Sequence, residues 1–86
     1  MMITRRTVAE KTAGYLRHEI SLVQLVDWAE AALLDGEIED SDAATISRVI
    51  ARLGVADVRA FGLAWEDCED LLRALGYAAR VEVVAA

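Results

Sequence analysis

Three segments of the sequence repeat apolar residues every three or four positions, and each segment is followed by a glycine: Gly36, Gly54 or Gly76. This spacing places the apolar side chains on one face of an α-helix, and glycine is common just beyond a helix end. The chain contains no proline that would interrupt such helices. The pattern therefore predicts a mainly α-helical protein.

We expect a compact bundle of four principal helices plus a short helical turn, with a short C-terminal β-strand. The helices are expected from Thr4 to near His18, from Ser21 to Gly36, from Asp40 or Ser41 to about Leu53, and from Trp65 to Gly76. The clearest start is Ser21, because Gln24 three residues later completes a capping box. Gly54 and Gly76 are both expected to be left-handed residues of Schellman motifs.

Ala64 precedes the last helix, where Ser, Thr or Asp would be preferred as the N-cap residue. The acidic residues that follow compensate in part, because they interact favourably with the helix dipole. Between helices we expect an acidic connection over residues 35–42. We also expect a short helical turn from Asp57 through Phe61, which Gly62 ends.

Charged and β-branched residues alternate over Arg80–Val83, a pattern typical of a β-strand. A strand needs a hydrogen-bonded partner. Residues Met1–Ile3 or a second copy of the chain would supply one.

An 86-residue chain buries one modest core, so residues 1–86 are predicted to form a single helical domain. That core leaves no space for a cofactor the size of a dinucleotide. Trp28 lies at the edge of its apolar stripe, and we expect its indole to be half exposed. The predicted core residues are Val8, Thr12, Tyr15, Leu16, Leu22, Leu25, Val26, Ala29, Ala32, Leu33, Ala43, Ile46, Val49, Ile50, Leu53, Trp65, Cys68, Leu71, Leu72 and Leu75.

The chain has a formal net charge of −6, which opposes binding to a polyanion such as DNA. Residues 45–63 are nevertheless similar to a bacterial helix-turn-helix, with Gly54 in the turn. The second helix of that motif would contain Arg59 as its one long base-reading side chain. We expect no nucleic-acid partner, and a helix-turn-helix protein is an alternative hypothesis.

The sequence contains no recognisable catalytic or metal-binding pattern. His18 and Cys68 are on separate predicted helices and lack the spacing of a metal site. Residues 35–46 lack the glycine and the glutamate that an EF-hand loop requires at its sixth and twelfth positions. Asp67 and Asp70 are expected to stabilise the start of the last helix. We therefore expect a protein that is not an enzyme and binds no metal or cofactor.

Several features predict a cytoplasmic protein. Cys68 is the single cysteine, and the first residues lack the basic and apolar pattern of a secretion signal. Apolar runs such as residues 31–34 are far shorter than the roughly 20 residues that span a bilayer, so we expect no membrane partner. Sixteen alanines and eight arginines against one lysine suggest a bacterial genome rich in G and C.

Acidic residues are concentrated in residues 19–47, which contain eight Asp or Glu and no Lys or Arg. The field of such a block would steer a basic protein partner, and Trp28 within it would be an aromatic anchor. A surface that only keeps the protein in solution explains the same pattern. The candidate partner-binding residues are Trp28, Glu37, Glu39, Asp40 and Asp42.

Residues 20–30 (ISLVQLVDWAE), 51–59 (ARLGVADVR) and 65–77 (WEDCEDLLRALGY) resemble those of a family of small, uncharacterised bacterial helical proteins. The Ser21–Ala29 pattern is also similar to helical immunity proteins, which neutralise toxins inside the producing cell. Ala64 departs from the capping Ser or Thr expected in such relatives. The resemblance implies a helical fold over nearly the whole chain and identifies no functional residue.

The first expected function is therefore a protein-binding module, an immunity- or antitoxin-like inhibitor of a basic partner. The alternatives are a helix-turn-helix DNA-associated protein and a structural homodimer without a ligand.

Overall fold

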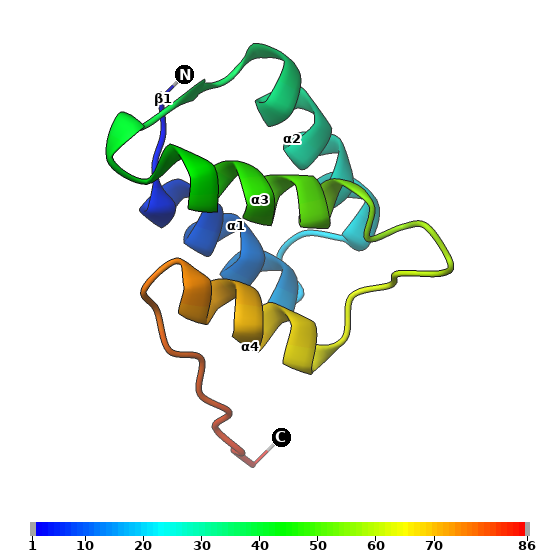
Figure 1. Ribbon diagram of the computed structural model, residues 1–86. Helices are drawn as coiled ribbons and strands as arrows, with labels where there is room; N and C mark the ends of the chain where they lie inside the picture. Colours follow the sequence, from blue (N-terminus) through cyan, green and yellow to red (C-terminus); the bar gives the residue numbers. More distant parts are fainter. Residues whose placement is uncertain (1, 86) are drawn as a thin grey trace.

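The computed structural model describes residues 2–85, in which four α-helices surround one apolar core (Figure 1). The elements are β1 (Met2–Ile3), α1 (Arg5–Leu16), α2 (Leu22–Asp35), β2 (Glu37–Ile38), the 3₁₀ helix η1 (Asp40–Asp42), α3 (Ala43–Gly54) and α4 (Trp65–Ala74). The mainly helical class is thus confirmed. Figure 1 shows α1 between α3 and α4, while α2 makes its main contact with α3.

The starts of α1 and α2 are the residues that the sequence predicted. Thr4 and Thr7 form a reciprocal capping box, in which each hydroxyl accepts the other's backbone N–H at 3.2 Å. In α2 the Ser21 hydroxyl accepts the Gln24 N–H at 3.1 Å, and the Gln24 side chain accepts the Ser21 N–H at 2.8 Å. These bonds satisfy N–H groups that have no partner inside a helix.

The end of α4 is the Schellman motif that the sequence predicted. Gly76 has a φ of 89°, the Tyr77 N–H donates to the Leu72 carbonyl at 2.9 Å, and the Gly76 N–H donates to the Arg73 carbonyl at 3.0 Å. Trp65 is also the first residue of the helix, as expected. The Asp67 carboxylate accepts the Ala64 N–H at 2.8 Å, a bond that the Ala64 side chain cannot reciprocate.

The prediction for Gly54 is wrong. Gly54 is the last residue of α3 and is not left-handed. The chain continues instead in tight turns, with the Ala56 N–H donating to Leu53 at 3.1 Å and the Val58 N–H donating to Val55 at 3.0 Å. These bonds satisfy carbonyls at the helix end without a left-handed residue.

Residues 57–61 form no α-helix, but the predicted single helical turn is present, because the Phe61 and Gly62 N–H groups both donate to the Val58 carbonyl. Gly62 then takes a φ of 62°, which glycine adopts at little cost. The second helix of the suspected helix-turn-helix is therefore absent from the described residues.

The prediction of a C-terminal strand at Arg80–Val83 is also wrong, because residues 77–85 contain no strand. β1 pairs instead with β2 in a two-stranded parallel sheet, with Met2 opposite Glu37 and Ile3 opposite Ile38. The Glu39 N–H extends this pairing by donating to the Ile3 carbonyl at 2.9 Å. The suggested partner residue Met1 lies outside the described residues.

The expected acidic connection therefore contains β2 and η1. Neither Asp40 nor Ser41 caps α3; the N-cap residue is Asp42, whose side chain makes no capping bond. The Asp42 carboxylate pairs with Arg5 of α1 at 3.4 Å instead. The connection is thus tied to the start of α1 at two places, through the sheet and through this ion pair.

Gly36 ends α2 for a steric reason that the sequence did not show. Its backbone is extended, with a φ of −78°. A Cβ at this position would lie 2.6 Å from the Ala32 carbonyl oxygen and would overlap the Ile3 side chain. Glycine is needed here because β1 packs directly against the end of α2.

The core consists mainly of the predicted residues, but Leu33 is an exception at 46% exposure. The end of α1 at Leu16, with Arg17 as its C-cap, is close to the predicted end near His18. Trp28 is half-buried at the edge of the core, as predicted. The largest fully buried side chains are Ile3, Val8, Thr12, Leu25, Val26, Ile46, Val49, Ile50, Leu53, Cys68 and Leu75.

Candidate functional site

The structure brings together the four predicted acidic site residues, because all of them lie on the short connection between α2 and α3. Glu37 is in β2, Glu39 follows it, and Asp40 and Asp42 are in η1. Glu37 and Asp40 are exposed, whereas Glu39 and Asp42 are half-buried. Of the predicted acidic connection over residues 35–42, Asp35 belongs to α2 and Gly36 ends that helix, so we use the name acidic connection from here on for residues 37–42.

Trp28 does not join this group. It lies seven residues before the end of α2, which corresponds to about 10 Å along the helix axis. Its ring packs against the core, and the Lys11 ammonium lies 5.8 Å from the ring centroid. This distance is within the range of a cation–π interaction. The indole is thus partly covered by α1.

The acidic block of residues 19–47 is mostly not neutralised within the described residues. Asp42 pairs with Arg5, but the remaining seven carboxylates form no ion pair there. They are Glu19, Asp27, Glu30, Asp35, Glu37, Glu39 and Asp40. All of them except Glu39 are exposed, so the negative charge of α2 and the acidic connection mainly faces solvent.

Two exposed aliphatic residues lie on the same side of α2 as some of these carboxylates. Val23 is 63% exposed and Leu34 is 83% exposed. Asp27 and Glu30 lie four and seven positions after Val23, and Leu34 lies eleven after it, so all four share one helix face. We refer to Val23, Asp27, Glu30 and Leu34 as the α2 outer face.

Sequence reasoning did not single out Val23 and Leu34 as exposed apolar residues of α2. The available signal was that both are apolar and fall opposite the buried stripe of their helix. Single exposed apolar residues are common on proteins and indicate little by themselves. The carboxylates of Asp27 and Glu30 between Val23 and Leu34 distinguish this face from such residues.

The side chains of Cys68 and His18 belong to different parts of the described structure. Cys68 is fully buried in α4, and burial, with the Asp67 carboxylate beside it, raises the pKa of its thiol to about 11. His18 is exposed just after α1 with a φ of 63°. Among residues 2–85, no group of three or more His, Cys, Asp and Glu side chains is placed to hold a metal ion.

None of the helices in the described part of the chain combines the length and apolar character needed to cross a membrane. No family model, curated protein or solved structure matches the chain. The resemblance of residues 20–30, 51–59 and 65–77 to small bacterial helical proteins, and of Ser21–Ala29 to immunity proteins, therefore stays a prediction.

Proposed function

We propose that the protein is a small cytoplasmic protein-binding module that inhibits or captures a basic partner, in the manner of an immunity or antitoxin protein. The supporting observation is that Val23 and Leu34 are exposed on a face whose neighbouring carboxylates have no ion-pair partner in the described residues. The proposed partner is a basic protein with an apolar patch. The module acts by binding and performs no catalysis.

The two kinds of side chain have different roles in this proposal. Carboxylates of the acidic connection accelerate association, because their field attracts a basic surface over several ångströms. Burial of Val23 and Leu34 then slows dissociation, since a buried aliphatic side chain contributes about 1.5–3 kcal/mol. Trp28, which is also in α2 and lies at the edge of the core, remains a predicted contact of the partner.

The helix-turn-helix alternative has less support, because residues 57–61 form turns and the net charge is −6. No observation favours a structural homodimer over the binding module.

The proposal is tested with a synthetic amphipathic helical peptide with one face of Leu and one of Arg, and a matched peptide with Glu in place of Arg. We expect the Arg peptide to bind and to shift amide NMR signals of α2, and the Glu peptide not to bind. Leu34→Gln should weaken binding about tenfold, the loss expected from one buried aliphatic contact.

Val83→Gln is the matched control, because Val83 is a 92% exposed aliphatic residue far along the chain from α2. This variant should bind like the native protein. Equal binding of both peptides, or equal loss in the two variants, would show that contact is non-specific and would overturn the proposal.

A further inference from the structure

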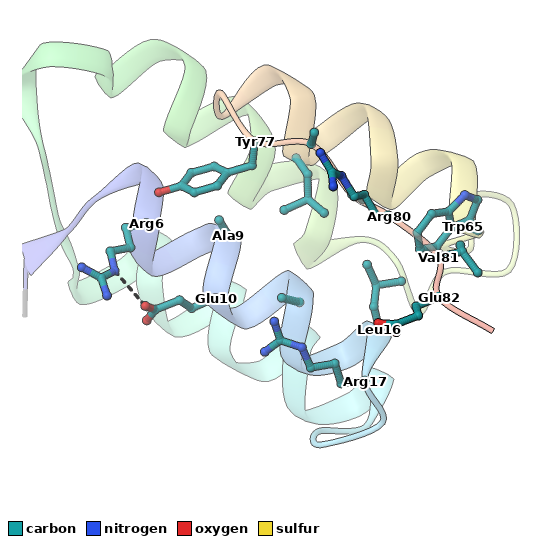
Figure 2. A pocket seen from close by; sticks show the side chains of 14 residues that line it. Arg6, Ala9, Glu10, Leu16, Arg17, Trp65, Tyr77, Arg80, Val81 and Glu82 are labelled. Carbon is teal, nitrogen blue, oxygen red and sulfur yellow. Dashed lines mark hydrogen bonds and ion pairs between the residues drawn. The ribbon is translucent and has the colours of Figure 1, made fainter. Parts of the chain in front are cut away.

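A groove of about 600 Å³ lies on another part of the molecule, between α1, α4 and the C-terminal segment that follows α4 (Figure 2). This volume is in the range of small-molecule pockets, which is roughly 300–1,000 Å³. None of the acidic connection and none of the α2 outer face lines it. The groove is therefore separate from the surface proposed to bind a protein.

Besides Arg6 and Glu10, five apolar side chains of α1 and α4 line the groove. Ala9, Ala13 and Leu16 line it from one helix, and Trp65 and Leu72 line it from the other. The two alanines have short side chains, and the positions from Ala9 to Leu16 span about 10 Å of helix axis. An extended alkyl chain fits such a surface.

Guanidinium groups stand at the edges of the groove. Arg17 comes from the end of α1 and Arg80 from the C-terminal segment, and Figure 2 shows them on two sides of the groove. Neither forms an ion pair within the described residues, whereas Arg6 is neutralised by Glu10 at 2.9 Å. Glu82 also lines the groove without pairing with either arginine. The lining thus contains three arginines and two glutamates in a protein of net negative charge.

The C-terminal segment forms one side of the groove and is held only lightly. The Tyr77 N–H makes the last hydrogen bond of the segment. Residues 78–85 neither donate nor accept a hydrogen bond within the described chain. Most of these residues are exposed, although Ala79 packs against the core. The segment can therefore adjust to a ligand without breaking hydrogen bonds of the fold.

We propose that the groove binds a small amphipathic carboxylate, an unbranched fatty acid of medium chain length. The alkyl chain lies along Ala9, Ala13 and Leu16, and the carboxylate accepts hydrogen bonds from Arg17 and Arg80. Arginine suits this role, because its planar guanidinium donates two parallel hydrogen bonds to a carboxylate.

The test is a titration of the ¹⁵N-labelled full chain with decanoate, below the concentration at which it forms micelles. Separate titrations with 1-decanol and with acetate remove the charge and the alkyl chain respectively. We expect saturable amide shifts in α1, α4 and residues 77–82 with decanoate. Binding should be at least about tenfold weaker with either of the other two compounds, since charge-assisted bonds and chain burial are each needed.

Three variants locate the site. The double substitution Arg17→Gln and Arg80→Gln should weaken decanoate binding about tenfold or more, and Ala13→Leu should block it by filling the groove. Arg48→Gln is the matched control, because Arg48 is an exposed arginine of α3 that does not line the groove. It should leave binding unchanged, and circular dichroism verifies that each variant is folded.

The proposal would be overturned by the absence of saturable shifts with decanoate, by decanol binding as tightly as decanoate, or by native affinity in the folded double variant. Shifts confined to α2 would overturn it as well, since they would place the ligand on the other surface.

Discussion

The Lys11 ammonium of α1 lies 5.8 Å from the centroid of the Trp28 ring of α2, so the one lysine of the chain covers one of its two tryptophans. The pair joins the basic first helix to the acidic second helix at the edge of the core. The ammonium also covers part of one face of the Trp28 ring.

We predict a favourable coupling between Lys11 and Trp28. A double-mutant cycle with Lys11→Gln and Trp28→Leu, followed by urea unfolding, should give a coupling free energy of about 0.5–1 kcal/mol. Trp28→Leu alone should also lower stability, because the ring packs against the core. A coupling of zero would mean that the ammonium is fully solvated and leaves the ring free.

Ser21→Ala should lower the free energy of unfolding by about 1 kcal/mol, within a range of roughly 0.5–2. The lost group is the hydroxyl that accepts the Gln24 N–H at 3.1 Å. Ser41→Ala is the control, since Ser41 is exposed and forms no capping bond. Denaturant midpoints that move equally in the two variants would contradict the capping role of Ser21.

Two glycine substitutions should have opposite effects. Gly36→Ala should destabilise the protein by about 1–3 kcal/mol, because the new Cβ would meet the Ala32 carbonyl oxygen and the Ile3 side chain. Gly54→Ala should be neutral or stabilising by up to about 1 kcal/mol, since the nearest atom is the Ala29 Cβ at 4.0 Å and the residue ends a helix. Thermal unfolding of both variants measures the contrast, which a loss of stability at Gly54 would refute.

Charge and apolar contact should separate in the kinetics of peptide binding. Converting Glu37, Glu39, Asp40 and Asp42 to their amides should slow association of the Arg peptide and reduce its dependence on salt. Leu34→Gln should instead increase the dissociation rate. The matched control is Glu66→Gln, an exposed acid of α4. An unchanged association rate and salt dependence in the amide variant would mean that the acidic connection only aids solubility.

Asp42 has a second role in that experiment, because its amide also removes the ion pair with Arg5. A variant that keeps Asp42 and changes the other three acids separates the two effects. Stopped-flow fluorescence of a labelled peptide measures both rates.

The Cys68 thiol should resist modification in the folded protein. Its pKa is raised to about 11 by burial and by Asp67, so very little thiolate is present at pH 8. Since the folded pKa lies above the ordinary value of 9.0, the stability gained from the neutral thiol is present below pH 9 and is lost between pH 9 and 11. Cys68→Ala should remove this part of the alkaline loss, which urea unfolding at pH 8 and pH 10.5 would measure. Rapid labelling by a thiol reagent at pH 8 without unfolding would contradict the burial of Cys68.

The features that sequence reasoning predicted correctly depend on residues near one another in the chain. The Ser21–Gln24 box and the Tyr77–Leu72 bond each join residues within five positions. Hydrogen bonds over such distances are largely determined by residue type and spacing, which is why the local sequence indicated them.

Two of the errors concern contacts between distant residues. Ile3 pairs with Ile38, and no local pattern distinguishes that partner from the alternating residues at Arg80–Val83. The local sequence likewise indicated only that Gly36 ends a helix. It did not show that Ile3 lies next to Gly36 in space. For the candidate site, sequence reasoning selected the acidic residues but not Val23 and Leu34. The relevance of these two residues depends on which neighbouring carboxylates lack ion pairs, and only the structure shows that.

The pairing of β1 with β2 also has a consequence for the order of folding. The bond from the Glu39 N–H to the Ile3 carbonyl closes a long loop that contains all of α1 and α2. Closing a loop of this length costs about 3 kcal/mol of chain entropy, which two-residue strands cannot repay alone. We therefore expect the two helices to form and pack before the sheet does. The acidic connection is then expected to acquire its conformation late in folding, after the core that supports it.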